Sequence, residues 1–477
     1  MSFLYRTEAK GIQSWILATD RLQELAGASQ IVNDLTSFAE QRAKACNGKV
    51  ISAAAGSANL EFPSIDALKA FAAWWPMAVG TRAPGLTVVQ AWVEGKDWEE
   101  LQARLSAARN QAWPDLPEAG PFMARAGRTG LPAVNQAANQ NGTQDAAMRT
   151  KQRSFKAGRD KLTEQLLGRE GPSFLVDHDA FPEGYLAVVH ADANGIGNLF
   201  ASGGVKDPTT FSRALEEATL AAAKSAVAKL PGLSSEGETI VAARPVVLGG
   251  DDFTIIVPGR DCLGFAQTFL TAFQDETQKR RDRLEYDLHA CAGVAIVKPG
   301  WPFHAAHRLA EELCQAAKRK FRDAGASGLA FHRVTTALSA SWDEVLTKEL
   351  STRGGSALTM NPYSLEELEK LAGLAETAAK LPRGTLRQWG TLARADTRAD
   401  TGRAREHWQR FREIAKQEQA SALHEFDEAL KELRAADPET GWDMNERTTP
   451  LVDVLEWHYA KRRSRGVRSH EQREATR

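Results

Sequence analysis

Cysteine is scarce in this chain, with four among 477 residues. The cysteines stand far apart and form no Cys-x-x-Cys pair, so the pattern predicts no zinc site and gives no sign of an oxidising compartment. Three of them lie among apolar residues of expected helices or strands, which favours thiols buried in the core. The positions are Cys46, Cys262, Cys291 and Cys314.

Long apolar runs are also missing. No stretch approaches the roughly 20 apolar residues that a membrane-spanning helix needs. The N-terminus carries Arg6, Glu8 and Lys10 and lacks the apolar core of a signal peptide. We therefore expect a cytoplasmic protein that does not enter a membrane. The nucleotide-binding fingerprints Gly-x4-Gly-Lys-Ser/Thr and Gly-x-Gly-x-x-Gly are absent as well.

Net charge is nearly absent too. A net charge of −1 argues against a surface that is positive throughout and would attract nucleic acid or an anionic membrane. The local exception is the basic stretch from Lys461 to Arg468, which is more typical of a solvated tail than of an RNA-binding segment. With 43% hydrophobic and 25% charged residues, the composition is that of a globular protein of about two to four domains.

Residues 1–110 follow the order strand, helix, strand, strand, helix, strand, which is the ferredoxin-like pattern. A break at Gly27-Ala28-Ser29, with Ser29 as helix cap, divides the first helical stretch in two. The expected strands are 3–5, 50–54, 60–62 and 86–93, and the expected helices are 11–25, 30–45, 65–77 and 97–108.

Residues 183–337 repeat this order more strongly, after a linker at 111–182 that holds one polar helix at about 145–167. The expected strands are 185–190, 246–248, 253–257 and 289–297, with a further edge strand at 329–334. Pro208 opens one helix, Asp261 can cap a second, and a third runs from 303 to 322.

Residues 338–460 are helical throughout, with a capping box at Ser364, a long helix at 404–433 and a short one near 451–455. Residues 461–477 form the basic tail. The expected fold class is therefore α+β, with two tandem ferredoxin-like domains followed by a C-terminal helical bundle.

Gly249-Gly250-Asp251-Asp252 lies between two apolar runs and is typical of a hairpin tip. Two glycines let the backbone approach a ligand closely, and adjacent carboxylates repel each other unless a cation lies between them. In a ferredoxin-like sheet the first strand lies beside the third, so Asp192, which ends the first strand, should meet this tip. Carboxylates placed this way can bridge two Mg²⁺ or Mn²⁺ ions.

Such a metal pair activates an attacking hydroxyl and neutralises a departing pyrophosphate. Gly195, Gly249 and Gly250 leave room for a triphosphate and offer N–H donors, and Lys318 could reach it as a point charge. The predicted reaction is nucleotidyl transfer, in which a 3′ or 2′ hydroxyl attacks the α-phosphate of an NTP. The product would be a cyclic mononucleotide, a cyclic oligonucleotide or a chain.

Several of these residues also have simpler interpretations. Successive strand residues point to opposite faces, so only one of Asp251 and Asp252 need face the metals. Lys318 is equally compatible with an exposed helix lysine, and Asn194 is as compatible with a turn as with a nucleotide contact. His304 and His307 stand one helical turn apart without a third ligand, which favours surface or packing roles.

The first ferredoxin-like half lacks the carboxylates that a two-metal site needs. Its hairpin tip, residues 55–58, has no carboxylate, and Glu8 alone makes no two-metal site. We expect a degenerate copy that packs against the second half and closes the nucleotide cleft.

The chain resembles the CRISPR polymerase family, the large subunit of type III CRISPR effector complexes, some of which make cyclic oligoadenylates. The second half resembles its catalytic palm domain, residues 13–16 and 27–29 resemble its other palm, and Met360-Asn-Pro-Tyr363 with the following helices resembles its helical domain. The matching stretches of the second half are 192–197, 249–252, 292–296, and 309–312 through 317–318.

The resemblance implies a palm-domain enzyme that uses ATP or another NTP in antiviral signalling. It implies catalytic roles for Asp192, Asp251 and Asp252, and two divalent ions held by Asp192, the Ala193 carbonyl and Asp251. It also allows RNA or CRISPR effector subunits as partners.

The sequence departs from the family pattern in three places. The HD nuclease domain that often begins these proteins is absent, and His178-Asp179 is an isolated dipeptide. The segment at 122–128 lacks the zinc-binding cysteines often found there, so no zinc is expected. Asn194 replaces a frequent aspartate, which removes one charge unless Asp192 and a backbone carbonyl suffice for the metal.

Three hypotheses follow. The favoured one is a nucleotide cyclase or polymerase with two divalent ions. The first alternative is a structural, RNA-binding large subunit whose palm is inactive. The second is a diguanylate or adenylate cyclase, although tandem palms in one chain argue against a homodimeric diguanylate cyclase.

Overall fold

The structure is a computed structural model that divides into two compact units, described here in turn. The first comprises residues 1–171, 197–217 and 245–250, and the second comprises the remainder. Ala55 of the first hairpin tip, the His178-Asp179 dipeptide and residues 462–477 of the basic tail lie outside the described residues. The described residues are 2–19, 21–54, 56–111, 120–134, 142–169, 171–175, 181, 184–235, 238–335, 341–395, 403–433, 437, 440–443 and 447–461.

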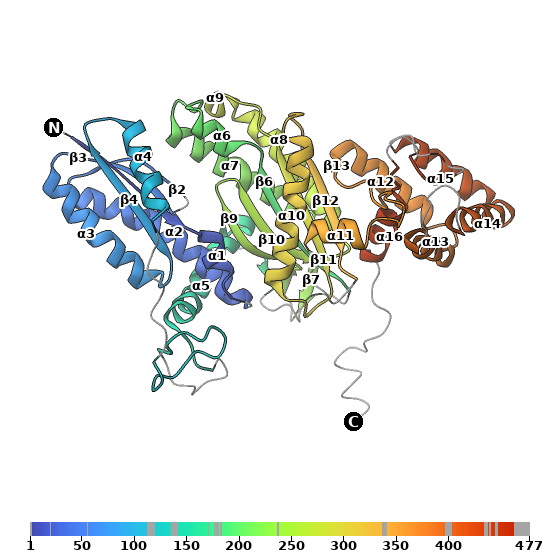
Figure 1. Ribbon diagram of the computed structural model, residues 1–477, viewed down its shortest axis with the longest axis horizontal. Coiled ribbons are helices and arrows are strands. Elements are labelled where there is room, and N and C mark those ends of the chain that lie inside the picture. Colours follow the sequence, from blue (N-terminus) through green and yellow to red (C-terminus); the bar gives the residue numbers. More distant parts are fainter. Residues whose placement is uncertain are drawn as a thin grey trace. The chain divides into compact units, whose positions relative to one another are not determined.

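A four-stranded antiparallel sheet in the order β2-β3-β1-β4 forms the base of the first unit (Figure 1). The first strand lies between the third and the fourth, which confirms the predicted ferredoxin-like order. The strands are β1 (Phe3–Lys10), β2 (Lys49–Ala54), β3 (Ser57–Phe62) and β4 (Thr87–Glu94), and the helices are α1 (Ile12–Leu17), α2 (Leu22–Ala45), α3 (Ile65–Arg82) and α4 (Trp98–Arg109).

Alternate strand residues of this sheet build its core. Leu4, Val89 and Val93 pack against Leu101 and Leu105 of α4, as expected where one face of a strand meets the apolar stripe of a helix. Glu8, the carboxylate closest to the position of Asp192 in the second half, forms ion pairs with Arg6 and Arg109. Its negative charge is therefore already balanced within this unit.

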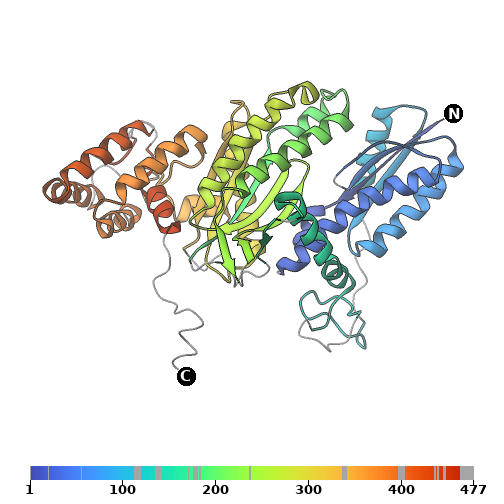
Figure 2. The same cartoon turned by 180° about the vertical axis from the view of Figure 1, so that it is seen from behind.

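The predicted helix break at Gly27-Ala28-Ser29 is wrong. The helix α1 ends at Leu17, and α2 runs from Leu22 straight through the small residues. A Cβ at Gly27 would overlap the carbonyl oxygen of Lys151 in α5 (Ala146–Leu167), and a Cβ at Gly158 would lie 2.6 Å from the carbonyl oxygen of Ala26. The glycines therefore serve close packing of two helices, the blue α2 and the teal α5 of Figure 2.

The second sheet has six strands in the order β13-β12-β11-β6-β10-β9. Its β11-β6-β10-β9 part repeats the ferredoxin-like order, and β12 adds a parallel strand beside β11. The predicted further strand is therefore confirmed, although β13 covers its outer edge. The strands are β6 (Leu186–Ala193), β9 (Arg244–Gly249), β10 (Asp252–Pro258), β11 (Ala290–Val297), β12 (Gly328–Arg333) and β13 (Tyr363–Ser364).

Two helices cover opposite faces of this sheet. On one face, Phe269 of α8 (Cys262–Lys279) stacks on Phe253 at a centroid distance of 5.1 Å. On the other, α10 (Phe303–Phe321) crosses β11, as the yellow helix in Figure 1 shows. A Cβ at Gly293 of β11 would overlap the carbonyl oxygen of Ala310. Glycine there lets the α10 backbone lie directly on the sheet.

A few shorter elements were not predicted from the sequence. They are α6 (Ile196–Ala201), α9 (Arg281–Leu284) and a small sheet of β5 (Ser173–Phe174), β8 (Glu238–Val241) and β7 (Gly232–Ser235). Pro208 does open a helix, α7 (Pro208–Val227), because its fixed φ suits the first helical position.

The C-terminal region is helical, as predicted, and the capping box at Ser364 forms with Glu367. The single helix predicted at 404–433 is wrong, because the chain leaves helical geometry at Gln419. The break lets Trp408 pack on Phe426 and Arg412 pair with Asp427. The helices are α11 (Trp342–Lys348), α12 (Leu365–Ala378), α13 (Arg383–Ala395), α14 (Arg403–Glu418), α15 (Ala420–Glu432) and α16 (Leu451–Ala460). None of the described helices is both long and apolar enough to cross a membrane.

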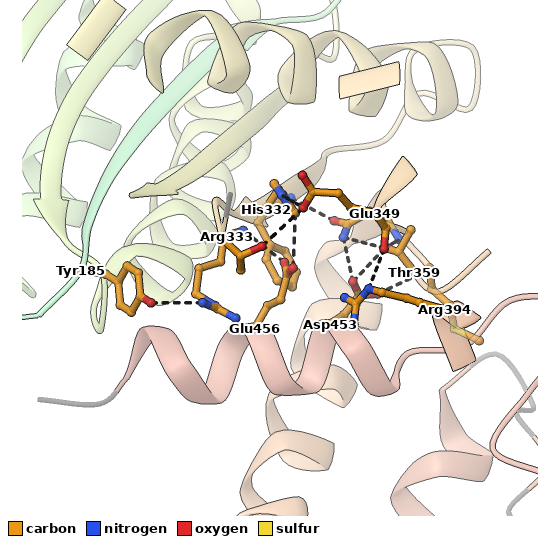
Figure 3. A network of polar contacts seen from close by, with 12 residues as sticks. Tyr185, His332, Arg333, Glu349, Thr359, Arg394, Asp453 and Glu456 are labelled. Carbon is orange, nitrogen blue, oxygen red and sulfur yellow. Dashed lines mark hydrogen bonds and ion pairs between the residues drawn. The ribbon is translucent and has the colours of Figure 1, made fainter. Parts of the chain in front are cut away.

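Asp453 on α16 is the centre of a buried polar network (Figure 3). Its carboxylate accepts hydrogen bonds from Thr359 Oγ1 and the Met360 N–H at 2.8 Å, from Asn361 Nδ2 at 3.1 Å and from Tyr363 Oη at 2.5 Å. Burial raises the pKa of Asp453 to about 7 even with these donors. The network ties α16 to the segment that leads into β13.

Glu456, one turn further along α16, reaches the end of β12. Its Oε1 lies 3.3 Å from His332 Nδ1, and its Oε2 accepts from the Arg333 N–H at 3.2 Å. The charge of His332 lowers the pKa of Glu456 against the opposing effect of burial. The six-stranded sheet and the helical region are therefore joined by buried polar side chains as well as by apolar contacts (Figure 3).

We expect Gly293→Ala to lower the free energy of unfolding by about 2 kcal/mol, because the added methyl must push α10 off the sheet. Urea unfolding measures this change. Gly264→Ala in α8 is the matched control, since nothing lies within 4 Å of its added Cβ. It should raise stability by about 0.5–1 kcal/mol. Equal effects of the two substitutions would contradict the close approach of α10.

We expect Asp453→Ala to destabilise the protein by about 3 kcal/mol, because several buried donors lose their acceptor. Asp323→Ala is the control, since the Asp323 side chain is 82% exposed and its loss should change stability by no more than about 0.5 kcal/mol. Urea unfolding of both variants checks the difference, and similar midpoints would show that the Asp453 network contributes nothing.

Candidate functional site

The acidic hairpin is tighter than the sequence indicated. The strand β9 ends at Gly249 and β10 begins at Asp252, so the turn consists of Gly250 and Asp251. Gly250 has a φ of 63°, in the left-handed region where a side chain is strained. A glycine at this position therefore closes the two-residue turn, and Asp251 is the second residue of that turn.

The sheet register brings Asp192 to this turn. Ala191 of β6 is paired with Phe253 of β10, so Asp192 comes next to the first residue of β10. The carboxyl of Asp251 hydrogen-bonds to that of Asp192. Burial, together with the negative charge of Asp192, raises the pKa of Asp251 to about 7. The structure thus brings together the two acids predicted to meet.

Lys318 of α10 lies against the same oxygens. Its Nζ donates to Asp192 Oδ2 at 2.5 Å and to the Ala193 carbonyl at 2.8 Å. Burial alone would lower the pKa of Lys318, but the charge of Asp192 raises it overall. The side chain is 14% exposed, so it is not an ordinary surface lysine. Contact with a triphosphate stays a prediction.

Asp252 turns to a different partner. Its Oδ1 lies 3.4 Å from Nδ1 of His190, which precedes Asp192 by two residues on the same face of β6. Burial lowers the pKa of His190 against the opposing charge of Asp252, which favours a neutral imidazole near pH 7. The two acids of the hairpin therefore have different neighbours, with Asp251 beside Asp192 and Asp252 beside His190.

Asn194 and Gly195 shape the end of β6. The Asn194 N–H donates to the His289 carbonyl at 2.7 Å, and its Nδ2 donates to the Ala326 carbonyl at 3.1 Å. Gly195 has a φ of 75° and leads into α6. Asn194 thus acts as a turn residue here. Its Oδ1 is buried and accepts no hydrogen bond from the described residues, so a nucleotide contact stays a prediction.

The oxygens around Lys318 fit a divalent cation. Asp192, Asp251 and the Ala193 carbonyl are hard ligands of the kind that Mg²⁺ and Mn²⁺ prefer. The ammonium of Lys318 already binds two of these groups, which shows that they suit a positive charge. No set of three His, Cys, Asp or Glu side chains among the described residues is arranged to hold a metal.

A polar group beside the acids was not predicted from the sequence. It consists of His190, Thr254, His307 and Glu311. The sequence singled out His307 as a packing or surface residue and Glu311 only as part of the stretch 309–312. Sequence spacing held the signal: His190 and Asp192 share a strand face, and His307, Glu311 and Lys318 share a helical stripe.

Comparison with known proteins bears on this region of the chain. Residues 185–326 match the family described as Cas10/Cmr2, second palm domain. This segment is similar to the second palm domain of Cas10/Cmr2 proteins. It contains Asp192, the acidic hairpin and Lys318, and the match confirms the resemblance recognised in the sequence. No curated protein matches the chain.

The fold of the whole chain is similar to solved structures of Csm1 in the Csm1–Csm4 cassette. The cassette with cA4 gives a TM-score of 0.52 at 14% identity, over 96% of this chain and 70% of that chain. The cassette with cA3 gives 0.52 at 12% identity, over 97% and 70%. The cassette with AMPPNP gives 0.51 at 13% identity, over 97% and 70%. The likeness confirms the fold class, in which tandem palm domains precede a helical region.

The raised pKa of Asp251 predicts a pH-dependent effect of Asp251→Asn. The ordinary pKa of 3.8 rises to about 7 on folding, so the folded carboxyl holds its proton more tightly than the unfolded one. Its contribution to stability is full below about pH 4 and is lost as the pH rises toward 7. The variant should therefore exceed the original protein in stability by about 1–3 kcal/mol at pH 8 and by little at pH 4.

Urea unfolding in EDTA at pH 4 and pH 8 measures this difference. Asp323→Asn is the control, because an exposed carboxylate should show the same small effect at both pH values. A stability difference for Asp251→Asn that is independent of pH would show that the carboxyl pair does not share a proton.

Proposed function

We propose that this chain is a nucleotidyltransferase that converts an NTP, ATP above all, into a cyclic nucleotide or cyclic oligonucleotide second messenger. It would do so by two-metal catalysis, as part of a type III CRISPR antiviral defence. The proposal rests on one observation: the contact between the carboxyls of Asp192 and Asp251 at the glycine hairpin, in a segment similar to the Cas10/Cmr2 second palm domain.

The residues of the site have distinct roles in this proposal. Asp192, Asp251 and the Ala193 carbonyl would hold two Mg²⁺ or Mn²⁺ ions. Divalent ions bound there supply positive charge that lowers the pKa of the attacking hydroxyl and neutralises the pyrophosphate. Lys318 would turn from Asp192 to the phosphates, and the backbone at Gly249 and Gly250 would let them approach closely.

The chemistry is a substitution at the α-phosphorus. The ribose hydroxyl oxygen forms a bond to that phosphorus, the bond to the bridging oxygen of pyrophosphate breaks, and the hydroxyl proton is released. ATP as the substrate is supported by the solved Csm1–Csm4 cassettes with AMPPNP and with cA4. Their likeness to this chain is one of fold, so the choice of base belongs to the proposal.

A second candidate is an effector subunit whose palm is inactive. The solved structures with this fold contain Csm1 together with a second protein, Csm4, which favours an assembly role. Asn194 in place of a carboxylate also reduces the negative charge near the site. In this case the chain would bind RNA or other effector subunits and hold an NTP without converting it.

Incubation of the full chain with each NTP and Mg²⁺ or Mn²⁺, with and without RNA, separates the two candidates. Mass spectrometry should detect a cyclic product from ATP, and Asp251→Ala or Asp192→Asn should reduce its formation by roughly two orders of magnitude or more, because charge stabilisation is lost. Asp323→Ala should match the original protein, since it is an exposed carboxylate outside the site.

Two outcomes would count against a cyclase. Product that persists in Asp251→Ala would point to a contaminating enzyme. No product from any NTP, with or without RNA, together with ATP retained on the protein, would favour the subunit with an inactive palm. Circular dichroism and urea unfolding establish that each variant is folded.

A further inference from the structure

A column of polar side chains lies between the sheet and α10, next to the acidic hairpin. His190 of β6 and Thr254 of β10 are directly opposite each other in the antiparallel register. Gly293 of β11 is opposite His190 on the other side, and its lack of a side chain lets α10 come close. His307 of α10 is thereby brought down onto Thr254.

The distances link these groups into a continuous series. His190 Nδ1 lies 3.0 Å from Thr254 Oγ1, which lies 3.4 Å from His307 Nε2. His307 Nδ1 lies 3.6 Å from Glu311 Oε2, and the two imidazole centroids are 5.3 Å apart. At the other end, His190 Nδ1 is 3.4 Å from Asp252 Oδ1. The series therefore runs from the hairpin to the partly exposed Glu311.

One arrangement of hydrogens gives both contacts of the Thr254 hydroxyl a donor. His190 Nδ1–H points to Thr254 Oγ1, and the Thr254 hydroxyl donates to His307 Nε2. The contacts at the two ends, from His190 to Asp252 and from His307 to Glu311, are approaches of 3.4 Å and 3.6 Å rather than hydrogen bonds.

Burying these polar side chains costs free energy that apolar side chains of the same shape would not cost. Thr254, His307 and His190 are 0%, 2% and 3% exposed. A buried polar group that loses its partner costs about 1–3 kcal/mol, whereas an apolar side chain of similar shape avoids that penalty. Ile256 and Val188 form the next cross-strand pair on the same face, and they show that the interface accepts apolar residues. The polar column is thus confined to the end beside the acids.

We propose that His190, Thr254 and His307 are positioning residues for the acidic hairpin. They fix Asp252 on the His190 side, which leaves Asp251 directed at Asp192, where a divalent ion would be held. In this proposal Asp252 is held by the column and is not itself a metal ligand. The inference deepens the proposed nucleotidyl transfer and rests on it, since it assigns the residues that hold the same site in register.

The test uses Thr254→Val, which removes the central hydroxyl and keeps the shape of the side chain. We expect Mn²⁺ affinity and kcat for product formation to fall about tenfold each, the usual scale for a group that orients a metal ligand, with KM for the NTP unchanged. Thr254→Ser should restore both, because it returns the hydroxyl. His190→Asn, which keeps a donor near Asp252, should retain more Mn²⁺ affinity than His190→Leu.

Thr277→Val is the matched control. Thr277 is 1% exposed, and its hydroxyl bonds to backbone carbonyls of Phe273, Gln274 and Leu288, away from the hairpin. This variant should leave Mn²⁺ affinity and kcat unchanged even if the urea midpoint falls. Electron paramagnetic resonance of free Mn²⁺ measures affinity without turnover, using the full chain.

The outcomes separate this inference from the proposed function. Mn²⁺ affinity that falls in Thr254→Val and returns in Thr254→Ser, without any cyclic product, supports the column and contradicts nucleotidyl transfer. Product formation and Mn²⁺ affinity that Thr254→Val leaves unchanged overturn the column and leave the function standing. A lower urea midpoint with unchanged Mn²⁺ affinity also overturns it, because the role is then only structural. Absence of Mn²⁺ binding to the original chain overturns both.

Discussion

The repulsion between two carboxyl groups held together at one sheet edge governs the rest of this structure. Asp192 lies near the end of β6 and Asp251 in the turn between β9 and β10, and the pairing of β6 with β10 brings their carboxyls into contact. Burial and mutual charge raise the pKa of Asp251 to about 7. Lys318 supplies a positive charge to Asp192 from a third element. A bound cation would relieve the repulsion between carboxyls that the backbone brings together.

The close approach of α10 to the sheet is what brings that positive charge within reach. It depends on Gly293, over which the helix backbone rests. The same stripe of α10 then carries Lys318 to the acids and His307 to Thr254. The absence of a side chain at Gly293 therefore lets α10 place both Lys318 and His307 beside the hairpin. Polar groups so deeply buried constrain geometry, because any shift leaves one of them without its partner.

The first unit has the same strand order without the same chemistry. Its Glu8 is occupied by Arg6 and Arg109, and glycines in α2 and α5 serve helix packing. Two copies of one fold thus differ in whether charge at the sheet edge is balanced within the unit. At the far end of the chain, Asp453 and Glu456 place further buried carboxylates at the join between β12, β13 and α16, so that the helical region is held to the palm by directional contacts.

Sequence alone determined the ferredoxin-like strand order that both sheets contain, the acidic hairpin and its meeting with Asp192. These follow from alternation along strands and from the connectivity of a ferredoxin-like unit, which local patterns encode. Tertiary structure decided the rest. Whether Gly27 breaks a helix or packs one, whether 404–433 is one helix or two, and which partner each hairpin acid takes all depend on contacts distant in sequence. The position of Lys318 against Asp192 is of the same kind, because helical periodicity fixes the face of a residue while packing fixes what that face meets.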